Sequence, residues 1–384
     1  MKLHRITTLA LKESREIVRD RLFFTLALVV PASLMLALGY GLTTDMEDVP
    51  IAILDYDRTP MSREYAHQFI ASHYFNFHGY LEREAQIDSL IAGRRVRAVL
   101  VIPPRFQRDL LRGRTVAVQS IASGTIVQPA ETVGGYVEGT TAAFSQKLAT
   151  RHVARREAVS PRAAEGILAP VRLQVRFFYN EPLDSRWGIV PGVMMIVLMF
   201  SLPLLTAVSI VREKETGSID NVYASTLTPA EFVAGKLIPY WTLAVVNGLL
   251  LWGIVTLLYG VPFRGDPWAF LASMMLFCLC TTALGLIVSL LVRTQIAAIL
   301  VMIVLTLIPA VLFSGVFVPL DSLGAAGRFQ SRLLPATYFN LIAQASFLKG
   351  VGVETIWPDM AMLAVYATVL LAIAWWRFTK RPRR

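Results

Sequence analysis

The sequence VREKETGSIDNVYASTLTPAEFVAGKLIPY, from Val211 to Tyr240, is a polar stretch between two long apolar runs. The first run occupies residues 188–211 and the second occupies residues 237–260. A helix that crosses a hydrocarbon core about 30 Å thick needs roughly 20 apolar residues. Both runs meet that length, so the fold depends on how this polar stretch joins two membrane-spanning helices.

Apolar residues also dominate the composition as a whole. Of 384 residues, 55% are hydrophobic and only 17% are charged, and this balance is typical of a membrane protein. The first apolar run has 21 residues, which exceeds the usual core of a signal peptide, so we interpret it as a permanent anchor. Six runs reach spanning length: 22–42, 188–211, 237–260, 268–292, 296–318 and 357–376.

Lysine and arginine near the ends of the spans predict the orientation, because they are enriched on the cytoplasmic side. Residues 1–21 contain six of them, and the basic tail 377–384 contains five. We therefore predict that both termini and the loop 212–236 are cytoplasmic, and that residues 43–187 and the loop 319–356 are external. The net charge of +10 is then explained by membrane orientation and contact with anionic lipid, and no nucleic-acid partner is expected.

The external segment 43–187 is long enough to form a domain. Short apolar runs such as VPIAILD and VRAVLVIPP alternate with stretches of helical spacing, which predicts an α/β domain around one sheet. A further helix is predicted from an apolar stripe at steps of three and four residues. That stripe packs either inside the domain or against a second copy or partner. Its members are Ile126, Ala130, Val133, Val137, Thr141, Phe144 and Leu148.

The predicted fold class is therefore an α-helical integral membrane protein. It has six transmembrane helices and an α/β extracytoplasmic domain inserted between the first and the second.

Motifs for catalysis or metal binding do not stand out. Cys278 and Cys280 are two positions apart within the fourth run, where helical geometry makes them face different ways. His67, His73 and His78 are close in sequence but lack the spacing of a metal site, so we interpret them as surface residues, with weak metal binding as the alternative. We predict no catalytic, metal or cofactor site in this chain.

The spans also lack the groups that power ion-coupled transport. Apart from Asp359, near the start of the last run, they contain no Asp, Glu, Lys, Arg or His. Secondary transporters usually place such groups at membrane depth, which disfavours that class. No GxxxxGK[ST] loop is present either, so any ATP must be bound by a separate chain.

The polar stretch itself has the signals of an ordered turn. Gly217 is suited to end a helix, and Thr228, Pro229 and Glu231 predict a capping box at the start of the next one. We expect a short segment from Ser218 to Ser225 to run along the membrane, and Arg212 and Lys214 to reach the lipid headgroups. An ordinary cytoplasmic loop is the alternative.

The same stretch resembles the cytoplasmic loop of type-2 ABC exporter permeases. Similarity continues in FFYNEPLDSRWGIVPG, in FSGVFVPLDSL and in the external segment AILDYDRTPMSREY, so it covers almost the whole chain. The resemblance implies that the loop couples the permease to an ATPase. The matching residues that it implies for this role are Arg212, Glu213, Glu215, Gly217, Ser218, Thr228, Pro229, Glu231, Gly235 and Lys236.

The resemblance further implies a permease subunit that pairs with a second copy or a paralogue and with two ATP-binding subunits. A periplasmic adaptor protein, the inner membrane of a Gram-negative bacterium and export of lipophilic or drug-like compounds are also expected. Residues 1–21 would form an amphipathic helix at the inner membrane surface, with a charged tail as the alternative.

We place the transport pathway between two copies, lined by the second and fifth spans. Packing against other helices or lipid is the alternative for its candidate residues. These are Met194, Met195, Met199, Phe200 and Ser314. The rival function is a membrane-anchored receptor or adaptor whose external domain binds a ligand or partner.

Overall fold

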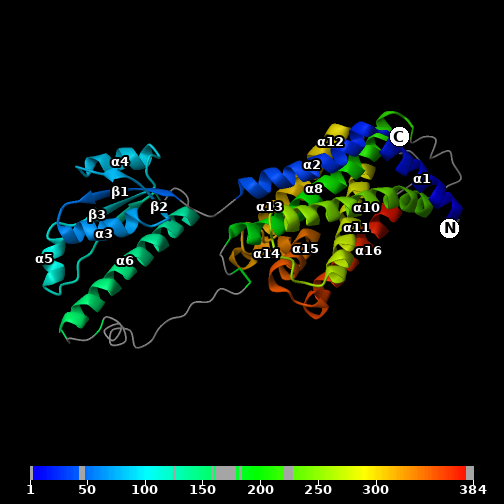
Figure 1. Cartoon of the computed structure of the whole chain (residues 1–384). Coiled ribbons are helices and arrows are strands. Elements are labelled where there is room, and N and C mark those ends of the chain that lie inside the picture. The colour runs from blue at the N-terminus through cyan, green and yellow to red at the C-terminus, as the bar shows by residue number, and fades with distance from the viewer. Residues whose placement is uncertain are drawn as a thin grey trace. The chain divides into compact units, whose positions relative to one another are not determined.

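The computed structural model describes residues 3–42, 48–123, 127–156, 160, 179–180, 184–218 and 228–377. The chain divides into two compact units, one formed by Thr44–Val175 and the other by Met1–Thr43 together with Arg176–Arg384 (Figure 1). We call them the α/β unit and the helical unit, and each is described by itself.

The helical unit is built from long apolar helices joined by short segments (Figure 1). π-Helical turns extend three of them, at Ile254–Leu258, Ile303–Leu307 and Ala345–Lys349. A 3₁₀ turn forms at Leu320–Ser322. The α-helices are α1 (Leu3–Arg19), α2 (Arg21–Gly41), α8 (Ser185–Glu215), α10 (Pro229–Gly253), α11 (Pro267–Leu291), α12 (Gln295–Met302), α13 (Ile308–Phe313), α14 (Ala325–Arg332), α15 (Pro335–Gln344) and α16 (Val353–Arg377).

Within the described residues, six helical segments are long and apolar enough to cross a membrane, and each coincides with one of the six predicted runs. The fifth predicted run, 296–318, is too long. Its helix ends at Phe313, because Gly315 takes a left-handed conformation with φ of +86° that breaks the helical path. The predicted loop 319–356 contains α14, α15 and the start of α16, whereas we expected only a connection.

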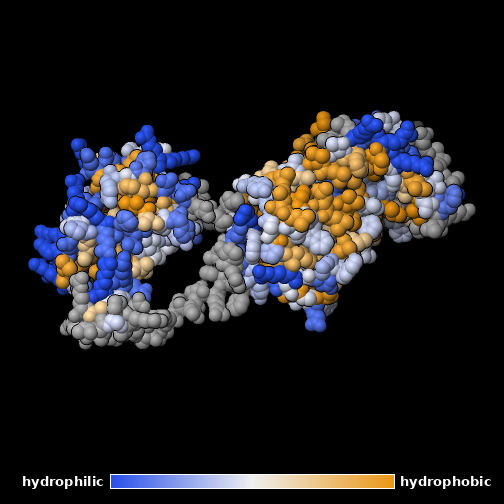
Figure 2. Space-filling view, viewed as in Figure 1, coloured by the Kyte–Doolittle hydropathy of each residue, from blue (hydrophilic) through white to orange (hydrophobic). Residues whose placement is uncertain are grey.

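Helix α8 lies at the centre of this unit. It packs against α2, α10, α11, α12 and α15, and it is the most buried of the six candidate spans. The helices that are least buried, α12 with α13 and α16, present apolar side chains outward. Figure 2 shows a broad hydrophobic surface on the face of this unit that is in view. A central apolar helix surrounded by half-exposed apolar helices is the expected arrangement when lipid is the solvent.

The α/β unit has the predicted alternation of strands and helices. Its sheet has the order β2-β1-β3-β4, in which β2, β1 and β3 are parallel and β4 is antiparallel to β3. The elements are β1 (Val49–Asp55), α3 (Pro60–Ile70), β2 (Phe75–Tyr80), α4 (Ala85–Ala92), β3 (Ala98–Ile102), α5 (Phe106–Leu111), β4 (Gln119–Ala122) and α6 (Val127–Arg156).

The predicted apolar stripe belongs to α6 and packs inside its own unit. Val133, Val137 and Phe144 are buried in one core with residues of the sheet and of α3. The hydroxyl groups of Thr141 and Tyr65 are 2.8 Å apart and form a hydrogen bond. Ile126 lies outside the described residues. The described part of the stripe therefore agrees with the first of the two alternatives, which is packing inside the domain.

Candidate functional site

The end of α8 forms as its sequence predicts. Gly217 has φ of +71°, and its N–H donates to the carbonyl of Lys214 at 3.2 Å. Ser218 Oγ donates to the carbonyl of Glu213 at 3.3 Å, so it also satisfies a free carbonyl at the helix end. The left-handed glycine turns the chain away from the helix axis. The segment expected to run along the membrane after Ser218 lies outside the described residues.

The start of α10 has the predicted capping box. The N–H of Glu231 donates to Thr228 Oγ1 at 3.3 Å, and the N–H of Thr228 donates to Glu231 Oε2 at 2.9 Å. Pro229 occupies the first turn, where its missing N–H has no cost. Glu231 is buried, and Arg5 of α1 lies 3.8 Å from its carboxylate. The box therefore fixes the start of α10 and also contacts α1.

Three charged side chains meet where α1, α8 and α10 come together. They are Glu13 of α1, Glu213 of α8 and Lys236 of α10, and we call them the Lys236 cluster. Lys236 Nζ lies 2.7 Å from Glu13 Oε1 and also donates to Glu213 Oε1. The exposed fractions are 1% for Lys236, 2% for Glu13 and 17% for Glu213. Charges this well buried are stable only when paired, so the cluster holds three helices in one arrangement.

The cluster has two carboxylates for one ammonium group. Burial raises the pKa of Glu13 above its ordinary value, and the nearby Glu213 carboxylate adds to the increase. The ammonium group of Lys236 acts in the opposite direction but does not cancel the effect of burial. Glu13 therefore holds its negative charge less readily than a glutamate in water.

Gly235 explains how α1 comes so close to α10. A Cβ atom at this position would lie 2.7 Å from Cδ2 of Leu9, which is too near for an ordinary contact. Ile6, Leu9 and Ile17 are buried on the same side of α1. The predicted amphipathic helix is therefore present over Leu3–Arg19, and its apolar face contacts protein. Val18 of the same helix is 63% exposed.

We predicted that Lys214 reaches the lipid headgroups, and this prediction was wrong. Its ammonium group donates to the carbonyls of Ser289 and Val292, at the end of α11. Free carbonyls at a helix C-terminus attract a cation, which is the physical reason for this position. Arg212 instead pairs with Asp20, with 3.0 Å between Nη1 and Oδ2.

Glu215 makes a second connection from the end of α8. Its Oε1 accepts the backbone N–H of Gln295 at 2.8 Å, and its Oε2 accepts the side-chain amide of the same residue. Together with Lys214, it attaches α8 to the turn between α11 and α12. Sequence spacing gave no sign of this attachment, because the partners are about 80 positions apart.

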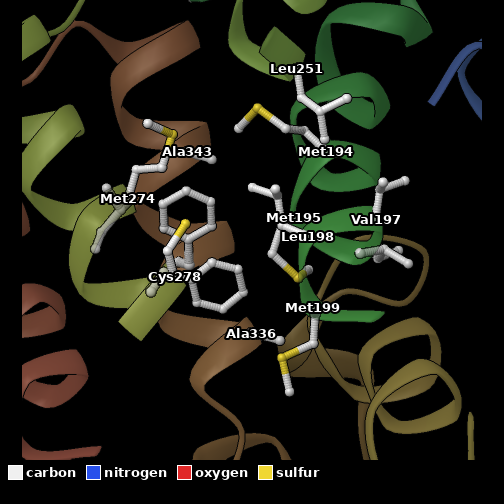
Figure 3. Packing of buried hydrophobic residues seen from close by; sticks show 14 of the residues in the cluster. Met194, Met195, Val197, Leu198, Met199, Leu251, Met274, Cys278, Ala336 and Ala343 are labelled. Carbon is white, nitrogen blue, oxygen red and sulfur yellow. The ribbon is translucent and has the colours of Figure 1, made fainter. Parts of the chain in front are cut away.

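The candidate pathway residues are mostly inside the helical unit. Met194, Met195 and Met199 are buried, and Figure 3 shows them on α8 among side chains of α11 and α15. This is the packed-helix alternative that the sequence left open. Ser314 is also buried, and its carbonyl accepts a hydrogen bond from Asn340 at 3.1 Å. Phe200 is half-buried.

The profile of the family described as "ABC-2 family transporter protein" matches residues 21–376, which is most of the chain. This chain belongs to the ABC-2 transporter family. The resemblance that began with Val211–Tyr240 is thereby confirmed.

Two individual relatives match this chain over nearly their full length, and a third matches it over about half of its own length. The Escherichia coli K12 protein named "Probable multidrug ABC transporter permease YbhS" is 28% identical over 378 residues, which are 98% of this chain and 97% of the relative. "Inner membrane transport permease YhhJ" of the same organism is 28% identical over 395 residues, covering 98% of each protein. "ABC transporter G family member 20" of Dictyostelium discoideum is 22% identical, and the match covers 94% of this chain but 48% of that relative.

All ten residues that the sequence assigned to coupling in this ABC-2 protein are among those described. Glu213, Gly235 and Lys236 belong to the contact between α1, α8 and α10, and Thr228, Pro229 and Glu231 cap α10. Arg212, Glu215, Gly217 and Ser218 hold or end α8. Sequence reasoning missed Glu13, because a single glutamate in an amphipathic helix gives no sign that it is buried.

Proposed function

We propose that this chain is the permease subunit of an ABC exporter that moves lipophilic or drug-like compounds out of the cell. In this proposal it forms the transmembrane pathway with a second copy or a paralogue. A separate ATPase subunit binds and hydrolyses ATP, because the sequence has no phosphate-binding loop. Two relatives carry names of this kind, a multidrug ABC transporter permease and an inner membrane transport permease.

The observation that carries the proposal is the Lys236 cluster. A turn that passes force from an ATPase to the membrane must be stiff, because a loose connection would absorb the movement. Here a left-handed glycine ends α8, a capping box starts α10, and buried charges attach α10 to α1. The contacts of Lys214 and Glu215 extend the attachment to α11 and α12. A push at the turn would therefore move five helices together, α1, α8, α10, α11 and α12.

In this proposal the turn and both termini face the cytoplasm, and the protein lies in a bacterial inner membrane. The α/β unit is then external and available to a periplasmic adaptor protein. The pathway lies between two permease copies. The outward apolar surfaces of α12 and α13, where Ile296, Leu300 and Val304 are exposed, support contact with a second copy or lipid.

The test is to purify the chain with its ATPase partner and reconstitute both in liposomes. We expect the exporter to hydrolyse ATP faster with a transported lipophilic compound than without it. A Glu213→Gln variant should still insert and bind the ATPase, but it should transport less compound per ATP. Glu354→Gln is the matched control, because Glu354 is an exposed glutamate at the start of α16.

Two results would contradict the proposal. One is a chain that purifies without any ATPase and stimulates none, as a membrane-anchored receptor would. The other is an unchanged ratio of transport to hydrolysis in Glu213→Gln, which would show that the cluster does not transmit force.

A further inference from the structure

A cavity of about 650 Å³ lies between the end of α1, the start of α2 and the last turns of α8. Tyr240 of α10 and Gln295 of α12 also line it. Of the Lys236 cluster, only Glu213 is among its lining residues. The cavity shares Arg212, Glu213 and Ser218 with the coupling residues, and the rest of its lining lies outside that set.

The charged residues at the ends of the spans indicate at what level of the membrane the cavity lies. Arg19 and Asp20 directly precede the apolar part of α2, and Arg212 is the first charged residue after the apolar part of α8. All three line the cavity. Charged residues at the ends of spanning helices lie at the level of the lipid headgroups. The cavity is thus at headgroup depth, where membrane lipid is the most abundant small molecule.

Both signs of charge line the cavity. Glu16, Asp20 and Glu213 supply carboxylates, and Arg19 and Arg212 supply guanidinium groups. Arg212 already bonds Asp20 at 3.0 Å, yet its side chain is 59% exposed and has donors left for another anion. Glu16 is 54% exposed and pairs with Lys12 at 3.2 Å, and its carboxylate can accept a further hydrogen bond. A ligand with one positive and one negative group would match both sets.

The remaining wall is apolar. Ile17, Phe23 and Val208 contribute it, from α1, α2 and α8. Tyr240 closes the cavity with its hydroxyl group bonded to Ser209. Apolar residues beside mixed charges suit an amphiphile, because its chains and its headgroup need different surroundings.

We propose that this cavity binds the headgroup of an aminophospholipid. The phosphate would contact Arg19 and Arg212, and the primary ammonium group would donate hydrogen bonds to Glu16 and Glu213. The acyl chains would leave along the apolar wall. A choline headgroup has no N–H donor and a glycerol headgroup has no positive charge, so ethanolamine fits this set of partners best.

The experiment uses the full-length protein in detergent and native mass spectrometry. Dioleoyl phosphatidylethanolamine, phosphatidylcholine and phosphatidylglycerol are each added at the same concentration. We expect the ethanolamine lipid to be retained best. The double variant Glu16→Gln/Arg19→Gln should lose about fivefold in affinity for it, which is the effect of two exposed charge contacts. Glu354→Gln/Arg328→Gln is the matched control, because both residues are exposed and far from the cavity lining.

A thermal measurement separates lost binding from lost folding. The ethanolamine lipid should raise the unfolding temperature of the wild type and of the control, but not that of Glu16→Gln/Arg19→Gln. Equal retention of phosphatidylglycerol would overturn the proposal in favour of a plain anion site. Equal stabilisation by phosphoethanolamine, which has no acyl chains, would overturn the lipid assignment. The permease is measured alone, so these results do not depend on the transport proposal.

Discussion

Lys236 Nζ lies 2.7 Å from Glu13 Oε1, although the two residues are more than 200 positions apart in the sequence. Both side chains are buried. The ammonium group also reaches Glu213, so one lysine connects α1, α8 and α10. Four predictions follow from this connection and from the turn that it supports.

Replacing Lys236 by methionine should destabilise the helical unit by about 3–5 kcal/mol, because the buried carboxylate of Glu13 and the half-buried carboxylate of Glu213 would lose the ammonium group that they share. Thermal unfolding in detergent measures the loss. Adding Glu13→Gln to this variant should recover part of it, since one unpaired charge is removed. Simple addition of the two single effects would show that the residues do not interact in the folded protein.

The raised pKa of Glu13 predicts a pH dependence of stability. The unfolded chain releases this proton near the ordinary glutamate pKa of about 4.3, before the folded chain does. The stability that protonated Glu13 contributes is thus fully present below the pKa of the unfolded chain. It is lost as the pH rises through the higher pKa of Glu13 in the folded chain. Unfolding temperatures from pH 4 to 8 should fall more steeply for the wild type than for Glu13→Gln. Parallel curves would contradict a raised pKa.

Gly217→Val should weaken coupling while leaving the spans inserted. Valine in the left-handed conformation costs roughly 1–2 kcal/mol, so the end of α8 would rearrange. Gly217→Asn should have a smaller effect, because asparagine tolerates this conformation better. Gly188→Val is the control, since a Cβ there meets open space and the φ is ordinary. Transport per ATP in liposomes should rank wild type, then Asn, then Val.

Glu215→Ala should uncouple α8 from the turn between α11 and α12 by removing both bonds to Gln295. Glu215 is exposed, so the change in stability should be small. We expect ATP hydrolysis to continue while transport falls several-fold. Glu354→Ala serves as the exposed control. A normal transport ratio in Glu215→Ala would show that the path through α11 and α12 is not used.

Several features of this site could be predicted because their signals are local. Thr228, Pro229 and Glu231 are within four positions of one another, and Gly217 ends its own helix. The spans were predictable for the same reason, since the length of an apolar run is compared directly with the thickness of the membrane. The predicted end of the fifth span was wrong, because hydropathy does not detect a left-handed glycine at position 315.

Features that depend on packing could not be predicted. Met194 and Met195 are as apolar in a pathway as in a core, so only the position of α8 among its neighbours shows that they are buried. Lys214 has the same charge whether it faces headgroups or the carbonyls of α11.

The amino-acid sequence determined which runs are apolar enough to span a membrane, and it determined that α8 ends before Gly217 and α10 starts after Thr228, because these properties arise between residues a few positions apart. The tertiary structure decided which charges are buried together. That choice depends on the approach of distant helices, such as α1 to α10 at Gly235, and on the high cost of leaving Glu13 or Lys236 without a partner away from water.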